Sequence, residues 1–175
     1  YRVAERLIDP HRMYRRHISS ELNRVWKVDG AVFVGLDSTA PRTAITNGRI
    51  TEEQLQFCAD AFSAANDGLA KIVVAHHHFA PAPDKERDRI MPKSERSMSR
   101  FVQMGVDLVL GGHLHRAYIG DSLDIYPNLR SGHQGIIIVQ CGTTTSRRGR
   151  AREKERNTLN AIEICKELVE VTHYM

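Results

Sequence analysis

Three short apolar runs constrain the fold of this chain more than any other feature. Residues 31–36, 70–75 and 106–110 are rich in Val, Ile, Leu and Ala, and polar or glycine-containing segments bound each run. Runs of this length and composition predict strands that are buried on both faces. Helical patterns lie between them, and strands that alternate with helices are typical of a mixed α/β fold. The three runs are therefore predicted to form the centre of a largely buried sheet.

The segments around these runs predict further elements. Thr51 precedes two glutamates, which is typical of a helix start, and the apolar face of this helix ends before Gly68. A second helix is expected over 94–104, and a helical segment over 2–24 is interrupted by Pro10. Beyond residue 115, the sequence predicts short strands in a mainly antiparallel arrangement; these are residues 117–120, 135–139, 158–164 and 168–173.

Composition limits the class of protein. A length of 175 residues fits one domain, and 41% hydrophobic with 26% charged residues is typical of a globular chain. No run approaches the ~18 apolar residues of a membrane helix, so no membrane span is expected. The three cysteines are widely spaced and form no paired motif, which favours a reducing compartment such as the cytoplasm. The net charge of +4 allows an anionic ligand without requiring nucleic acid.

Histidines gather directly after two of the predicted strands. His76, His77 and His78 follow the second strand, and the third strand runs into Gly111-Gly112-His113-Leu114-His115. Because 113 − 76 = 37 residues with one helix connect the clusters, both are expected at the same edge of the sheet, where α/β folds bind ligands. Neutral imidazole is the commonest metal ligand in proteins. The clusters thus predict a metal site, whereas His17, His133 and His173 are interpreted as ordinary structural histidines.

Five stretches of the chain together resemble a known family. They are 33–38, 48–55, 73–78, 106–115 and 142–146. The His run followed by a proline-containing loop and the Gly-His-x-His element resemble the last two motifs of the calcineurin-like metallophosphoesterases. Within that superfamily the pattern looks most like the cyclic-nucleotide phosphodiesterase-like branch, and the resemblance covers nearly the whole chain from about residue 20.

The resemblance implies a fold, an activity and a set of ligands. The fold would be a β-sandwich flanked by helices, of which this chain would be the C-terminal part of a four-layer αββα domain. The activity would be metal-dependent hydrolysis of a phosphate-ester substrate, by a phosphodiesterase or phosphatase with a metal-activated hydroxide and a dinuclear centre of Mn, Fe, Zn or Co. By position, His76 and His113 would bind one ion and His115 the other, while His77 would act as a catalytic residue beside the phosphate; the alternative is that His77 replaces His76 as ligand.

The earlier motifs of that family are missing from the chain. Asp-x-His, Gly-Asp-x-x-Asp and Gly-Asn-His-Asp/Glu would have to precede the His run, and the matches at Asp9-Pro10-His11 and at 120–124 are interpreted as chance. Together with a first residue, Tyr1, that is not Met, this predicts that residues 1–175 are the C-terminal portion of a catalytic domain, weakly active or inactive alone. The alternative is a non-catalytic interaction or regulatory domain that keeps the fold without the site.

Two cation-rich loops carry open interpretations. Lys85, Arg87 and Arg89 follow the His run and would either steer a phosphate or lie in a solvated loop. The basic stretch from Ser146 to Arg156 is interpreted as a solvated loop. Contact with nucleic acid is the less favoured alternative, because no aromatic residues lie among the cations for base stacking. Neither the substrate nor the oligomeric state follows from the sequence.

Overall fold

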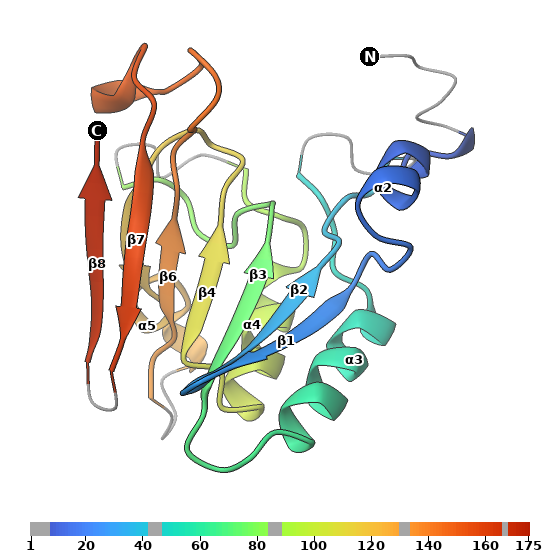
Figure 1. Ribbon diagram of the computed structural model, residues 1–175. Coiled ribbons are helices and arrows are strands. Elements are labelled where there is room, and N and C mark those ends of the chain that lie inside the picture. Colours follow the sequence, from blue (N-terminus) through green and yellow to red (C-terminus); the bar gives the residue numbers. More distant parts are fainter. Residues whose placement is uncertain (1–7, 42–46, 84–88, 130–133, 166–167) are drawn as a thin grey trace.

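A six-stranded mixed sheet forms the centre of the molecule. The computed structural model describes residues 8–41, 47–83, 89–129, 134–165 and 168–175. The central strands of the sheet run parallel, and β1 runs antiparallel to β2 (Figure 1). The other edge strand, β5, runs antiparallel to β6. In spatial order the strands are β1 (Arg24–Val28), β2 (Ala31–Leu36), β3 (Ala70–Ala75), β4 (Leu108–Gly111), β6 (Ile137–Gln140) and β5 (Tyr118–Asp121).

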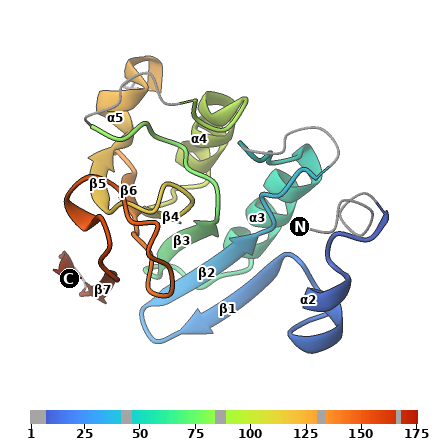
Figure 2. The same ribbon diagram turned by 90° about the horizontal axis from the view of Figure 1, so that it is seen from above.

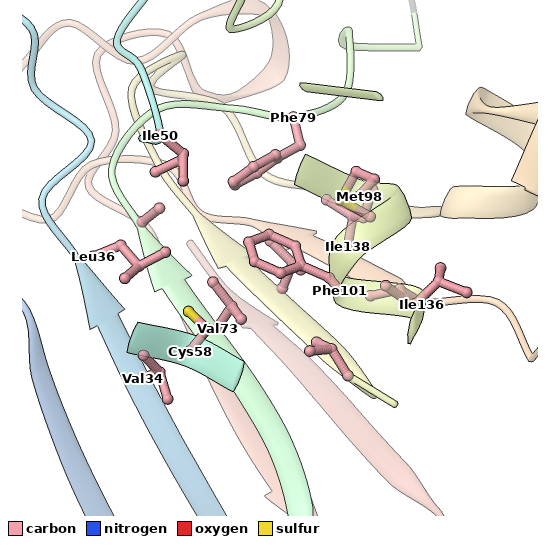
Figure 3. Close-up of a cluster of buried hydrophobic side chains, with 14 of the residues drawn as sticks. Val34, Leu36, Ile50, Cys58, Val73, Phe79, Met98, Phe101, Ile136 and Ile138 are labelled. Atoms are coloured by element: carbon pink, nitrogen blue, oxygen red, sulfur yellow. The ribbon is translucent and has the colours of Figure 1, made fainter. Parts of the chain in front are cut away.

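Two amphipathic helices cover one face of this sheet. They are α3 (Glu52–Ser63) and α4 (Ser94–Gln103). A capping box starts α3, since the Thr51 hydroxyl accepts from the Gln54 backbone N–H and the Gln54 side chain accepts from the Thr51 N–H. Apolar side chains of both helices pack on the parallel strands, and Figure 3 shows Cys58 of α3 and Phe101 of α4 in this cluster.

A separate hairpin packs on the opposite face. The hairpin consists of β7 (Leu159–Ile164) and β8 (Val169–Tyr174), and Figure 2 shows the helices on one side of the central strands and β7 on the other. Its inward side chains contact Ile72, Leu108 and Val139 of the central sheet. The hairpin leaves Trp26 of β1 43% exposed on that same face. The chain therefore has a helical layer, a central sheet and a two-stranded second layer.

The structure confirms most of the predicted elements and corrects others. All three central strands are present, the predicted helices begin at Glu52 and Ser94, and the tail contains the expected antiparallel hairpin. The strand predicted over 135–139 is instead part of the central sheet, where β6 runs parallel to β4. Within the described part of 2–24, the helix is limited to Ile8 and α2 (Arg12–His17), and the chain then enters β1. Short helical turns occur at α5 (Ser122–Ile125), η1 (Pro127–Leu129) and η2 (Ala151–Glu153).

The sequence did not predict β1 because most of this strand is exposed. Only Arg24 is partly buried, so the apolar and charged residues of β1 do not produce a clear alternating pattern. The strand is stabilised by its pairing with β2 and by Trp26, which lies over Gly35, where a Cβ atom would come within 2.7 Å of the indole ring. A cross-strand contact of this kind is a tertiary feature.

All three cysteines are free thiols, and burial raises the pKa of Cys58 to about 12. None of the helices among the described residues is long and apolar enough to cross a membrane.

Candidate metal centre

Three histidine side chains meet at the carboxyl edge of the parallel strands. His76 and His77 directly follow β3, and His113 follows β4 by two residues. One ring nitrogen of each residue lies within 4.8 Å of the others. The two strands pair in parallel and are joined by a crossover through α4, so their carboxyl ends and both clusters lie at one edge, as the spacing predicted.

The distance between His76 and His113 fits two ligands of one ion. His76 Nε2 and His113 Nδ1 lie 3.2 Å apart. Two nitrogens at about 2.0–2.1 Å from a tetrahedral metal would be separated by roughly 3.3 Å. The same distance also suits a hydrogen bond between the two imidazoles when one ring carries the proton. The donor set of neutral imidazoles suits Zn, Fe, Mn or Co.

An unusual backbone conformation positions His113. His113 and His115 have φ angles of 72° and 53°, in the left-handed region, which costs roughly 1–2 kcal/mol per non-glycine residue. The turn is stabilised by Leu114, which is buried between them and whose N–H donates to the Gly112 carbonyl over 2.9 Å. Strain of this kind persists where the surrounding structure enforces it, and it clusters at functional sites.

A serine after β2 orients His77. Ser38 is buried; its hydroxyl oxygen accepts from the His77 backbone N–H over 3.1 Å and lies 2.9 Å from His77 Nδ1. If Nδ1 carries the proton, it donates to Ser38 and leaves the lone pair of Nε2 available; if the Ser38 hydroxyl donates instead, Nε2 carries the proton. Gly48 packs against this pair so closely that a Cβ atom there would lie 2.4 Å from the His77 ring.

The environment of the cluster keeps the imidazoles of His76 and His77 neutral. Burial, and then the neighbouring His113, His76 and His78, lower the pKa of His77 to about 4, while Asp37 opposes this shift. His76 is exposed as a whole residue, but its ring packs edge-on against His77 and His113, and this desolvation together with His115 lowers its pKa. Neutral imidazole is the form that binds metals, so the cluster is ready to bind an ion at neutral pH.

The predicted site residues do not all join this group. His76, His77 and His113 come together, whereas His115 lies outside the group but close enough to His76 to lower its pKa. His78 is buried and its ring stacks on that of His113 with centroids 5.6 Å apart. Among the residues that the structure describes, the group contains three imidazoles and no carboxylate.

The remaining chemistry-bearing residues of the sequence have other surroundings. Asp9 lies 3.9 Å from Arg15, and Asp121 caps α5 by accepting from the Leu123 N–H. His173 lies in β8, 2.8 Å from Asn160. Arg89 is exposed, and the other cations of its loop, Lys85 and Arg87, lie outside the described residues, as does His133.

Sequence reasoning missed a second set of residues at the same edge. Ser38 and Asp37 directly follow β2, so the strand-end argument used for the histidines would also have identified them. His11, by contrast, could not be found in this way. Its Nε2 lies 3.1 Å from Asp37 Oδ2 and 3.2 Å from Thr39 Oγ, and no sequence pattern connects these residues.

Comparison with solved structures supports the fold. A purple acid phosphatase from yellow lupin (Lupinus luteus) seeds matches with a TM-score of 0.50 and 17% sequence identity. The fold resembles the metallophosphoesterase fold. The match covers 69% of this chain and 22% of the phosphatase chain, so the chain spans about a fifth of that structure. No family model matches the sequence, and no curated protein matches it either.

This likeness is limited to the fold. The phosphatase is a calcineurin-like metallophosphoesterase, and the match to it extends to the fold alone. The match does not distinguish the cyclic-nucleotide phosphodiesterase-like branch from other branches, so that finer assignment stays a prediction.

Proposed function

We propose that this chain belongs to a metal-dependent phosphoric ester hydrolase and that the edge carrying His76, His77 and His113 is its metal-binding edge. One observation carries the proposal: three imidazoles from the ends of two parallel strands converge, with a His76–His113 nitrogen separation that fits one ion. The fold likeness to a purple acid phosphatase supports the reaction class.

The ligands would divide between two ions. His76 and His113 would bind one ion, and His115 would bind the second, with Mn, Fe, Zn and Co as candidates. Metal ions bound there would lower the pKa of a coordinated water molecule and stabilise the phosphoryl oxygens of the substrate. The finer prediction is a phosphodiesterase of the cyclic-nucleotide phosphodiesterase-like branch, supported by the motif pattern alone.

The role of His77 would depend on the proton of its ring. When Nδ1 donates to Ser38, Nε2 has a free lone pair and can join His76 and His113 as a ligand, in agreement with its place in the group. When the Ser38 hydroxyl donates to Nδ1, Nε2–H can donate to a phosphate oxygen of the substrate. In both cases Ser38 holds the ring, and the lowered pKa of His77 keeps it neutral.

We also propose that residues 1–175 are the C-terminal portion of a catalytic domain. Dinuclear centres need carboxylates to balance the metal charge, and the described histidine group contains none. The face of the sheet beside β7–β8 also leaves Trp26 exposed, as expected if further structure packs there. The absence of a carboxylate from the described group equally favours the second candidate, a non-catalytic domain that keeps this fold.

Metal binding is the first test. Zn²⁺ titration by calorimetry should show binding to the chain, and His113→Asn should weaken it at least about tenfold, because a ligand is lost while Asn tolerates the left-handed backbone. His173→Ala, which removes a histidine from β8, is the matched control and should leave Zn²⁺ affinity unchanged. Equal affinities in the chain and in His113→Asn would refute the site.

Hydrolysis distinguishes the two candidate functions. Cleavage of bis-p-nitrophenyl phosphate with Mn²⁺ would be measured on this chain and on a version extended at its N-terminus. Activity in the extended version that is lost in His113→Asn supports the hydrolase. Inactivity of both versions, despite metal binding, favours the non-catalytic domain.

A further inference from the structure

The excess positive charge of the chain is concentrated in one loop between β6 and β7. Residues 146–156, here called the basic loop, contain six cations and two acids, so their net charge is 6 − 2 = +4. The whole chain has 25 − 21 = +4. Charge is therefore balanced over the rest of the sequence. The cations are Arg147, Arg148, Arg150, Arg152, Lys154 and Arg156.

These cations are available to a ligand. All six are exposed, and within the described part of the chain none of them forms an ion pair. Of the two acids in the loop, Glu155 is exposed, whereas Glu153 is buried and its carboxylate accepts hydrogen bonds from the Ala117 backbone N–H and the Thr158 hydroxyl. The loop thus presents six charges toward solvent without an internal counter-charge from Glu153.

The basic loop is tethered beside the candidate metal centre. The Arg150 N–H donates to the His115 carbonyl over 3.0 Å, and Glu153 bonds to Ala117, two residues further along. Gly142 allows this approach, because a Cβ atom there would lie 1.9 Å from the Glu153 carboxylate. His115 in turn is two residues from His113 of the histidine group.

We propose that the basic loop binds additional phosphate groups of the substrate. On this proposal, which rests on the proposed phosphoesterase function, the preferred substrate is a small phosphate ester that carries at least one further phosphate beyond the one cleaved. Guanidinium groups bind phosphate through paired hydrogen bonds, and arginine is favoured wherever such geometry matters. Arg148 is two residues from the tethered Arg150, so its Cα lies within about 7 Å of that tether.

A nucleic-acid strand is the less favoured ligand. Proteins that bind single strands place aromatic side chains for base stacking among their cations. Residues 141–158 contain no Phe, Tyr or Trp. The basic loop is therefore suited to compact phosphate charge more than to a stacked strand.

Calorimetry with inorganic probes tests the proposal without bound metal. In chelator and at low ionic strength, tripolyphosphate should bind the chain at least about tenfold more tightly than orthophosphate. Replacing Arg147, Arg148 and Arg150 by Gln should weaken tripolyphosphate binding about tenfold or more. The matched control replaces Arg12, Arg15 and Arg16 of α2 by Gln; these are also exposed, and α2 lies far from η2 at the same end of the molecule (Figures 1 and 2). This control should change the affinity by less than about twofold.

Glu153→Ala separates placement from net charge. This substitution raises the net charge by one, so tripolyphosphate would bind more tightly if charge alone mattered. The proposal expects weaker binding, because alanine lacks both oxygens that accept from the Ala117 N–H and the Thr158 hydroxyl and the loop loses its tether, with thermal melting used to confirm that the variant is folded. Tighter binding by a folded Glu153→Ala protein would overturn the proposal.

The other outcomes are equally decisive. Equal weakening in the loop variant and the α2 variant would show nonspecific attraction and overturn the proposal. A single-stranded oligothymidylate that binds at least about tenfold more tightly than tripolyphosphate would replace it with nucleic-acid binding. Because the probes bind without metal, loss of Zn²⁺ binding in His113→Asn tests the proposed function separately.

Discussion

Replacing Gly48 by Ala should disturb the candidate metal centre through one pair of side chains. Gly48 has a φ of +66°, and a Cβ atom there would lie 2.4 Å from His77 Cγ and Nδ1 and 2.4 Å from the Ser38 carbonyl oxygen. Both neighbours are buried, and Ser38 and His77 are joined by two hydrogen bonds. Neither can move away without breaking that pairing.

The expected cost has two parts. A left-handed backbone costs an L-residue about 1–2 kcal/mol. Forcing a methyl group into a packed site adds about 1–3 kcal/mol. The free energy of unfolding should therefore fall by about 2–5 kcal/mol. Gly68 is the matched control: its φ is +83°, but nothing lies within 4 Å of a Cβ atom there, so Gly68→Ala should cost only the first part.

Urea denaturation and Zn²⁺ calorimetry on both variants test this reasoning. Gly48→Ala should lose more stability than Gly68→Ala, and it alone should weaken Zn²⁺ binding, because the His77 ring is displaced. If the two variants lose the same stability and both bind Zn²⁺ like the parent chain, the packing of Gly48 against His77 does not support the site.

Two further predictions concern pH and the start of α3. Burial and the neighbouring histidines lower the pKa of His77 from 6.5 to about 4, so the unfolded chain binds more protons than the folded chain between these values. The stability contribution of His77 should be complete above about pH 6.5 and fall by on the order of 2–3 kcal/mol as the pH drops toward 4. When the free energy of unfolding from urea denaturation is plotted against pH over this range, His77→Asn should show a weaker dependence on pH than the parent chain. An equal dependence on pH in both proteins would contradict the assignment. Thr51→Ala removes the hydroxyl that accepts from the Gln54 N–H and should destabilise the chain by about 0.5–2 kcal/mol in the same assay; a loss below a few tenths would mean that the capping box adds little.

The fold could be predicted from the sequence where the signal is local. Residues 31–36 and 70–75 are strands in the structure because a buried parallel strand needs a continuous apolar run, and such a run is visible in the sequence. The parallel pairing of β6 with β4 was not predictable in the same way. A short apolar run shows that a strand is buried, but its direction depends on the path of residues 112–136.

For the candidate site, the sequence by itself determined which residue types stand at the strand ends. It placed His76 and His77 after β3 and His113 after β4, and parallel pairing then brings these strand ends to one edge. The tertiary structure decided which side chains meet. Ser38 and His77 are 39 residues apart, and Glu153 and Ala117 are 36 apart. Contacts over such separations depend on how the loops pack over the edge of the sheet. That packing cannot be predicted from the spacing of residues along the chain.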